Sequence, residues 1–270
     1  MINITEKEFV DLSTFIKTNY GIDLTKKKVL IESRLANTLM QKGMKSFTEY
    51  IDLVKRDRNG EEITVLLNKL TTNHTYFLRE QQHFNFLKTD VMPFIVNKNK
   101  FTKMIRIWSA GCSTGQEAYT IAMTINEFFG GLATTWKVYI TATDISENVL
   151  AKGRAAIYTK EELKDIPPQW IKKYFTDLNN GSFKLNDLIK NQVTFQKANL
   201  MQPFTMRPFD IIFCRNVMIY YDAPTKDKLV QKFYEQTAPG GFFFIGLSES
   251  INRQTVKYKY LKPAIFQREG

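Results

Sequence analysis

The hydrophobic pattern of this chain changes near residue 105. Beyond that point, short apolar runs rich in β-branched and aromatic residues alternate with stretches of helical period at 116–129, 147–156 and 225–237; the runs read "IRIWSA", "KVYITATD", "FDIIFCRNV" and "GGFFFIGLS". Continuously apolar runs of this length fit strands that are buried on both faces. The alternation therefore predicts an α/β domain whose mainly parallel sheet is covered by helices on both sides.

The chain before residue 105 has a helical period. Its apolar residues fall on one face in four short stretches separated by glycines, and Ser46 with Glu49 forms a capping-box pattern at the start of one of them. We expect a small all-α domain over residues 1–78. A longer helical stretch followed by the polar run "NKNKFTK" predicts a linker helix and a turn over residues 79–103.

One part of the α/β region interrupts the alternation, at about 158–197. It contains "PPQW", the hairpin signal Asn180-Gly181, and two candidate short strands, "SFKL" and "VTF". We expect these two runs to be antiparallel strands of a small β-rich insertion on the sheet.

Composition narrows the class of protein. The 270 residues include two cysteines and two histidines, which predicts neither a disulfide framework nor a metal site. There is no run of roughly 20 apolar residues and no apolar signal-peptide core at the start, so the expected location is the cytoplasm. The net charge of +11 indicates an anionic partner. Its densest basic run, at Lys26, Lys27 and Lys28 with Arg34, fits a docking surface or a solvated helix face equally well.

Candidate ligand-binding residues follow the first two apolar runs. Gly111 and Gly115 follow "IRIWSA", and Asp144 ends "KVYITATD". In an open α/β sheet, ligands bind beyond the carboxyl ends of the strands, and glycine allows the backbone to approach a ligand closely. An acid at the second tip can accept hydrogen bonds from both hydroxyls of an adenosine ribose. These features fit enzymes that use NAD and enzymes that use S-adenosylmethionine (AdoMet), while two glycines alone also fit a plain strand-to-helix turn.

The loop between the two glycines favours AdoMet over NAD. It reads Gly-Cys-Ser-Thr-Gly and lacks the third glycine of the dinucleotide motif. Glu117, in the first turn of the following helix, would repel a pyrophosphate but suits a ligand that carries an amino group and a sulfonium. Cys112 and Cys214 are expected to be small buried side chains.

Five stretches carry a resemblance to a known family. "TTNHTYFLREQQHF", "RIWSAGCSTGQEAYTIAM", "ATDISENVLAKGRAAIY", "FDIIFCRNVMIYYD" and "PGGFFFIGLSES" occur in the order found in the chemotaxis receptor methyltransferases, the CheR family. The chain resembles that family over nearly its whole length. The resemblance implies a helical receptor-recognition domain, a linker, and a Rossmann-like AdoMet-dependent methyltransferase domain over 104–270 that carries a β-subdomain. It also implies transfer of methyl from AdoMet to glutamates on the cytoplasmic helices of methyl-accepting chemotaxis receptors, which yields glutamyl methyl esters and S-adenosylhomocysteine.

The resemblance further implies which residues form the site. The positions that match cofactor-binding positions of the family are Asn73, Thr75, Arg79, Gly111, Glu117, Asp144, Asn199, Leu200, Asn216 and Val217. Arg79 is also a catalytic candidate, because its guanidinium can hold the carboxylate of the cofactor or of the substrate. Tyr220, four residues past Asn216, can hydrogen-bond the target carboxylate or simply pack. The family uses the N-terminal domain to recognise the receptor, which favours the docking reading of the basic run. We expect a monomer.

The chain departs from the family at two places. Many relatives have two consecutive acids where this chain has Gln116-Glu117, and the loop "DLNNGSFKLN" is shorter than in relatives that grip a receptor tether peptide. The short loop argues against tether binding.

Two other functions compete with receptor methylation. A nucleic-acid methyltransferase would explain the charge but usually has an N-P-P-[YF] motif where this chain reads "CRNVMIYY". A non-catalytic AdoMet-sensing module would not need the complete set of site residues. We therefore expect an enzyme that acts on protein.

Overall fold

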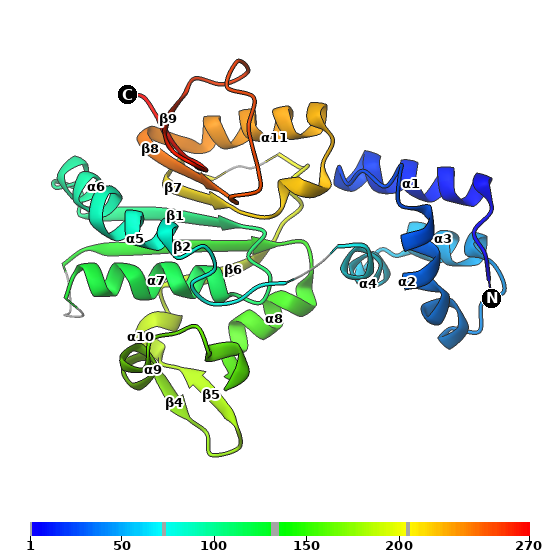
Figure 1. Ribbon diagram of the computed structural model, residues 1–270, viewed down its shortest axis with the longest axis horizontal. Helices are drawn as coiled ribbons and strands as arrows, with labels where there is room; N and C mark the ends of the chain where they lie inside the picture. Colours follow the sequence, from blue (N-terminus) through cyan, green and yellow to red (C-terminus); the bar gives the residue numbers. More distant parts are fainter. Residues whose placement is uncertain (1, 72–73, 131–134, 204–205) are drawn as a thin grey trace. The chain divides into compact units, whose positions relative to one another are not determined.

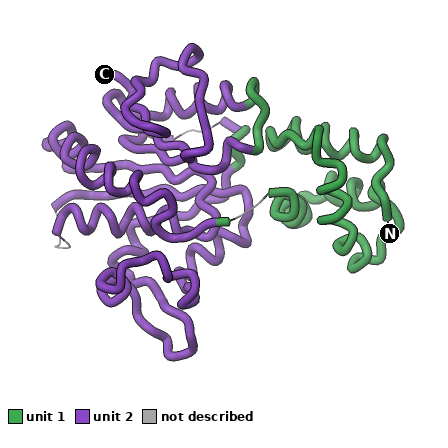
Figure 2. The backbone as a smooth tube through the Cα atoms, in the orientation of Figure 1, with its two compact units in different colours: residues 1–74, 199–201, 220–225 green, residues 75–198, 202–219, 226–270 purple. Residues whose placement is uncertain are grey.

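The computed structural model describes residues 2–71, 74–130, 135–203 and 206–270. The chain forms two compact units (Figure 2). The first comprises residues 1–74, 199–201 and 220–225, and the second comprises residues 75–198, 202–219 and 226–270. In the described part of the chain, no helix has both the length and the apolar character that crossing a membrane requires.

The first unit contains the predicted helices: α1 (Glu6–Tyr20), α2 (Lys28–Gln41), α3 (Phe47–Arg56) and α4 (Glu61–Leu70). The predicted cap at Ser46 is present, since its side chain accepts a hydrogen bond from the Glu49 backbone. Thr5 and Glu8 form a second, complete capping box at the start of α1. The apolar faces meet in a core that includes Leu12, Ile16, Ile31, Leu35, Leu39, Tyr50 and Leu66. The all-α prediction for this part is confirmed.

The predicted linker helix is part of the second unit. It runs without a break through α5 (Gln82–Phe86), the π-helical turn η1 (Leu87–Val91) and α6 (Met92–Lys98). It begins at Gln82 because Leu78 and Glu80 both have φ of 57°, which no helix accommodates. Its apolar face lies in the core of the second unit.

The second unit is built on a seven-stranded sheet of order β6-β2-β1-β7-β8-β10-β9 (Figure 1). The neighbours from β6 to β8 pair in parallel, whereas β10 and β9 pair antiparallel. The strands are β1 (Met104–Ala110), β2 (Lys137–Asp144), β6 (Val193–Lys197), β7 (Phe209–Cys214), β8 (Thr237–Ile245), β9 (Tyr258–Lys262) and β10 (Ile265–Arg268).

Helices cover both faces of this sheet, as predicted. On one face, Phe213 of β7 stacks on Phe84 of α5 at a ring-centroid distance of 6.1 Å. On the other face, Trp108 of β1 meets Phe233 at 5.2 Å. The helices of the α/β region are α7 (Gln116–Phe128), α8 (Glu147–Ala155) and α11 (Ala223–Gln236), close to their expected bounds.

The insertion forms a separate three-stranded antiparallel sheet of order β3-β5-β4. Its elements are β3 (Ile157–Thr159), the 3-10 turn η2 (Glu161–Leu163), α9 (Pro168–Tyr174), β4 (Phe175–Asp177), β5 (Ser182–Leu185) and α10 (Asp187–Lys190). The prediction that "SFKL" is an antiparallel strand is confirmed.

The prediction for "VTF" is wrong. These residues begin β6, which pairs in parallel with β2 as the edge strand of the main sheet. The apolar side chains of Val193 and Phe195 point into the core of the second unit. Alternation identified the strand, but partner choice depends on which core covers its apolar face, and three residues carry no signal for that.

Candidate active site

The tips of β1 and β7 approach each other closely at Gly111. This glycine has φ of 79°, and a Cβ added to it would lie 2.4 Å from Cγ2 of Val217. Its N–H donates to the Thr143 carbonyl at 2.8 Å, as does the N–H of Cys112 at 2.9 Å. Only glycine fits such a position, which brings the candidate residues Gly111 and Val217 together. Burial raises the pKa of the Cys112 thiol, consistent with a structural cysteine.

Asp144 stands at the tip of β2, the neighbour of β1. One oxygen of its carboxylate accepts from the Ser113 N–H at 2.9 Å, and the other accepts from the Ser146 N–H at 3.0 Å. Burial raises the pKa of this carboxyl, and the backbone donors oppose the rise. The Ile145 N–H is a third backbone donor to this carboxylate. A carboxylate has about four acceptor sites, so acceptor capacity remains for a ribose hydroxyl.

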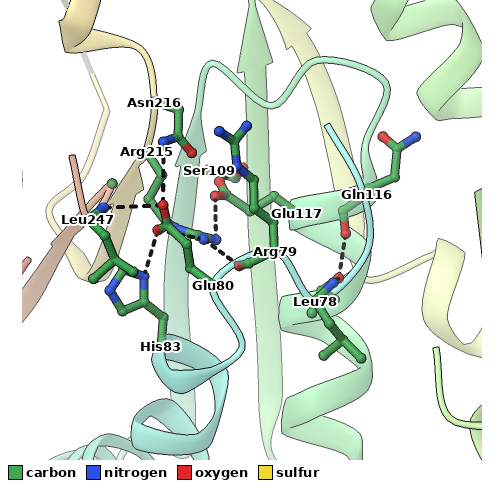
Figure 3. Close-up of polar contacts among 12 residues, drawn as sticks. Leu78, Arg79, Glu80, His83, Ser109, Gln116, Glu117, Arg215, Asn216 and Leu247 are labelled. Carbon is green, nitrogen blue, oxygen red and sulfur yellow. Dashed lines mark hydrogen bonds and ion pairs between the residues drawn. The ribbon is translucent and has the colours of Figure 1, made fainter. Parts of the chain in front are cut away.

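Glu117 lies in the first turn of α7, whose N-cap Gly115 has φ of 94°. Its Oε1 accepts from the Ser109 hydroxyl at 2.7 Å, and its Oε2 lies 3.2 Å from Nη1 of Arg215 (Figure 3). Burial raises the pKa of Glu117, and the Arg215 guanidinium opposes that rise. The carboxylate is thus held in place while two lone pairs stay available to a cationic ligand.

Arg215 is a functional candidate that the sequence analysis missed. Its side chain is 2% exposed, its Nη2 lies 2.9 Å from Glu80 Oε2, and it also donates to the Arg79 carbonyl. Glu80, another missed residue, accepts from the Leu247 N–H at 3.2 Å and from the Asn216 amide at 3.4 Å. The signal for both was a charged residue beside apolar runs, in "FLRE" and "FCRNV".

His83 is buried beside this cluster, with Nδ1 3.4 Å from Glu80 Oε2. Burial lowers the pKa of this imidazole to about 4. The ring is therefore neutral at physiological pH. The sequence analysis assigned His83 no role, and in the structure its ring lies beside the Glu80 carboxylate.

Asn216 follows β7 in the left-handed region, with φ of 59°. Its backbone N–H donates to Glu249 at 2.9 Å, and the same carboxylate accepts from the Gly246 N–H at 2.6 Å and the Met218 N–H at 2.7 Å. Burial raises the pKa of Glu249, opposed by these donors. Glu249, which the sequence analysis also missed, therefore fixes the loop that carries Asn216 and Val217.

Arg79 and Thr75 lie in the segment before α5, in the second unit. The Arg79 guanidinium is 5.8 Å from the centre of the Tyr76 ring, and both residues are half-buried. Asn73, the third candidate of this segment, lies outside the described residues.

Three other candidates belong to the first compact unit: Asn199, Leu200 and Tyr220. The Asn199 amide donates to the Asn19 carbonyl at 2.8 Å, and Leu200 is buried. Lys27 Nζ lies 5.4 Å from the centre of the Tyr220 ring. Their contacts with the cofactor or substrate stay predictions.

Of the predicted basic residues, Lys26 and Lys27 precede α2 (Lys28–Gln41), Lys28 begins it, and Arg34 lies near its middle. Lys26 is exposed, and Lys28 Nζ lies 2.8 Å from a Glu6 oxygen in an exposed pair. Arg34 donates to the Lys69 carbonyl at 2.9 Å. The surface is therefore basic and only partly neutralised by its neighbours.

Two family models match the chain. Residues 7–71 match the all-alpha domain of CheR methyltransferases, and residues 73–266 match their SAM-binding domain. The chain is similar to a chemotaxis protein methyltransferase of Borreliella burgdorferi, with 42% identity over 99% of this chain and 96% of the relative. A chemotaxis protein methyltransferase of Escherichia coli is 35% identical over 92% of this chain and 86% of the relative.

Among solved structures, the chain is similar to the glycopeptide N-methyltransferase MtfA complexed with S-adenosyl-L-methionine, at 14% identity and a TM-score of 0.35, over 67% of this chain and 64% of that one. So weak a likeness carries no argument. The family models and the curated relatives are decisive: this chain belongs to the CheR methyltransferase family and takes part in S-adenosylmethionine-dependent methylation in chemotaxis.

Proposed function

We propose that this enzyme transfers the methyl group of AdoMet to glutamate side chains of chemoreceptors, forming glutamyl methyl esters and S-adenosylhomocysteine. The observation that carries the proposal is the likeness, over almost the whole chain, to chemotaxis protein methyltransferases. The reaction would take place in the cytoplasm, on the helical receptor region, by a monomeric enzyme.

The residues at the strand tips fit AdoMet. The Asp144 carboxylate keeps acceptor capacity for a ribose hydroxyl beside its backbone donors, and Glu117 is an acid suited to the amino group. Gly111 allows the backbone to approach the ligand, and Asn216 and Val217 would frame it from the tip of β7. When bound, AdoMet supplies a methyl group already activated by the sulfonium.

The proposed methyl transfer needs no general base from the protein. A glutamate carboxylate, with a pKa of about 4.3 when free, is already an ionised nucleophile at neutral pH. The residues must align its oxygen with the methyl group and exclude water, and alignment of this kind lowers a barrier by several kcal/mol. Arg79 is the residue we assign to hold a carboxylate, and Tyr220 is a second candidate for contact with the target.

Receptor recognition is assigned to the basic surface of Lys26, Lys27, Lys28 and Arg34. The methylation regions implied by the family are helices rich in glutamate, so the charges are complementary. Complementary exposed charge raises the rate of encounter and selects the partner.

A label-transfer experiment tests the proposal. The protein is incubated with AdoMet carrying a tritiated methyl group and with cytoplasmic receptor fragments. We expect label on the receptor that mild base releases as methanol, because carboxyl methyl esters are hydrolysed whereas methylated amines are not. Label that resists base, or that enters nucleic acid rather than receptor, would show that the proposed reaction is wrong.

Arg79→Ala tests the role of Arg79 in this reaction. We expect this variant to melt like the wild type, because the half-buried side chain contributes little to the core. We expect it to transfer no methyl, because no guanidinium would hold the carboxylate. A variant that melts normally and methylates at the wild-type rate would remove Arg79 from the site.

A further inference from the structure

A buried guanidinium joins three elements of the second unit. Arg215 follows β7, Glu80 and Arg79 lie in the segment before α5, and Glu117 is in α7 (Figure 3). The Arg215 side chain is 2% exposed, and burying a cation is costly unless ion pairs and hydrogen bonds replace its water. It has both: two carboxylates, one carbonyl, and the Phe84 ring 5.2 Å from its Cζ.

Arg215 donates two hydrogen bonds to Glu80 and one to Glu117. Glu80 Oε2 accepts from Nη2 at 2.9 Å and from Nε at 3.3 Å, a fork that fixes the plane of the guanidinium. Its other oxygen is held by the Leu247 N–H and the Asn216 amide. The remaining Nη1 then meets Glu117 at 3.2 Å. Glu80 thus orients the guanidinium, and the guanidinium orients Glu117.

We propose that Arg215 is a positioning residue for the cofactor: braced by Glu80, it holds the Glu117 carboxylate ionised and aimed at the amino group of AdoMet, and it fixes the main chain at Arg79. The inference rests on the proposed role of Glu117. It adds a residue that acts through Glu117 and Arg79 rather than by touching the cofactor.

The charges around Glu117 explain why a cation is needed there. Glu80 repels the ionised form of Glu117, and burial also disfavours it. Of the other titratable neighbours, His83 is neutral above its pKa of about 4, and burial raises the pKa of Cys112 and of Cys214. Arg79 is a second cation in this cluster (Figure 3), and its carbonyl accepts a hydrogen bond from Arg215. Arg215 stabilises ionised Glu117 directly, because its Nη1 lies 3.2 Å from the Glu117 carboxylate.

Glu117 binds the amino group only when ionised, so affinity for the cofactor falls as pH drops through the pKa of this carboxyl. Burial already raises the pKa of Glu117, and Arg215 opposes that rise. Removing Arg215 should raise the pKa further, so the loss of affinity should begin at a higher pH than in the wild type.

Calorimetric binding of S-adenosylhomocysteine from about pH 6 to about pH 8 tests this inference. We expect a nearly flat profile for the wild type. Arg215→Met should bind roughly tenfold more weakly or worse at pH 7 and lose further affinity toward pH 6. Arg215→Lys, which keeps the charge but not the fork, should recover the flat profile with only part of the affinity.

Two further variants complete the experiment, one as a fallback and one as a control. Arg215→Met combined with Glu80→Gln removes one buried charge of each sign, so it keeps the test open if Arg215→Met alone does not fold. We expect it to acquire a weaker pH dependence than Arg215→Met, because Glu80→Gln also removes a charge that repels ionised Glu117. Lys98→Met removes a partly buried ion pair with Asp210, near the start of β7, and should leave the binding profile unchanged.

The outcomes separate this inference from the proposed role of Glu117. Wild-type affinity and a flat profile in Glu117→Gln would refute the role of Glu117 in binding. Weak binding by Glu117→Gln together with a wild-type profile in the Arg215 variants would refute the positioning role alone. A loss that is equal at every pH, and that Arg215→Lys does not reduce, would mean that Arg215 only supports packing.

Discussion

At the level of single residues, Asp144 and Glu117 differ in which groups already donate hydrogen bonds to their carboxylate oxygens. Asp144 accepts hydrogen bonds from the backbone N–H groups of Ser113, Ile145 and Ser146, whereas Glu117 is held by a hydroxyl and a guanidinium. Backbone donors bring no formal charge, so Asp144 keeps its negative charge, which strengthens the hydrogen bonds that ribose hydroxyls donate to it. One guanidinium, that of Arg215, is shared by Glu80 and Glu117, so negative charge remains near Glu117 for a cationic group.

Asp144→Asn tests the ribose assignment at the level of one atom pair. The amide keeps the shape but loses the charge and one acceptor, so the ribose should lose at least one charge-assisted hydrogen bond. Such a bond is worth roughly 1.5–3 kcal/mol, which corresponds to about 10- to 150-fold weaker binding of S-adenosylhomocysteine in calorimetry. Unchanged affinity in a variant that melts like the wild type would contradict the assignment.

At the level of elements, α8 packs closely on β6 because Gly153 in α8 has no side chain. Gly153 is buried in α8, and a Cβ added there would lie 2.7 Å from Cε1 of Phe195 in β6. Its carbonyl also accepts from the Tyr119 hydroxyl at 2.7 Å. The glycine lets the helix approach the edge strand that follows the insertion.

Gly153→Ala should therefore destabilise the protein, although alanine is the better helix former. The gain in helix propensity is about 1 kcal/mol, whereas overpacking a core costs typically 1–3 kcal/mol. We expect a net loss of roughly 1 kcal/mol in the free energy of unfolding, measured with urea. Phe195→Leu should reduce that loss in a double-mutant cycle, because the smaller side chain leaves room for the methyl group. Stabilisation by Gly153→Ala would show that the ring moves aside at no cost.

At the level of the whole molecule, the net charge of +11 is the feature that points to a partner. Most of this net charge belongs to the second unit, because residues 1–74 contain 12 Lys and Arg against 10 Asp and Glu. The first unit nevertheless has three adjacent lysines before and at the start of α2. Exposed charges are screened over about 8 Å at physiological salt. The lysines at 26–28 and the candidate cofactor-binding acids Glu117 and Asp144 lie in different compact units, so we expect their roles to be separable by mutation.

Reversing Lys27 and Lys28 to Glu tests this separation. The pair of Lys28 with Glu6 is exposed and contributes little to stability, so the fold should persist. We expect the KM for receptor to rise roughly three- to tenfold and its salt dependence to weaken, with unchanged affinity for S-adenosylhomocysteine. Lys257 and Lys259, both exposed in the second unit, provide a control reversal with the same change in net charge. Equal effects from both reversals would assign the result to net charge rather than to docking at α2.

Local pattern by itself determined most of the elements. The period of apolar residues identified the four N-terminal helices and the doubly covered sheet, because burial of one face imposes that period wherever an element packs. It also placed Gly111, Glu117 and Asp144 near one another, since parallel neighbouring strands end at the same edge of a sheet.

Only the tertiary structure decided which strands pair and which charged residues contact each other. β6 joins the main sheet rather than the insertion, because its apolar face must meet a core that lies elsewhere in the sequence. The cluster of Arg215 with Glu80 and Glu117 joins residues up to 135 positions apart, and Glu249 reaches back 33 positions to hold Asn216. A buried charge is stable only beside its partner, and spacing along the chain carries no record of which residue that partner is.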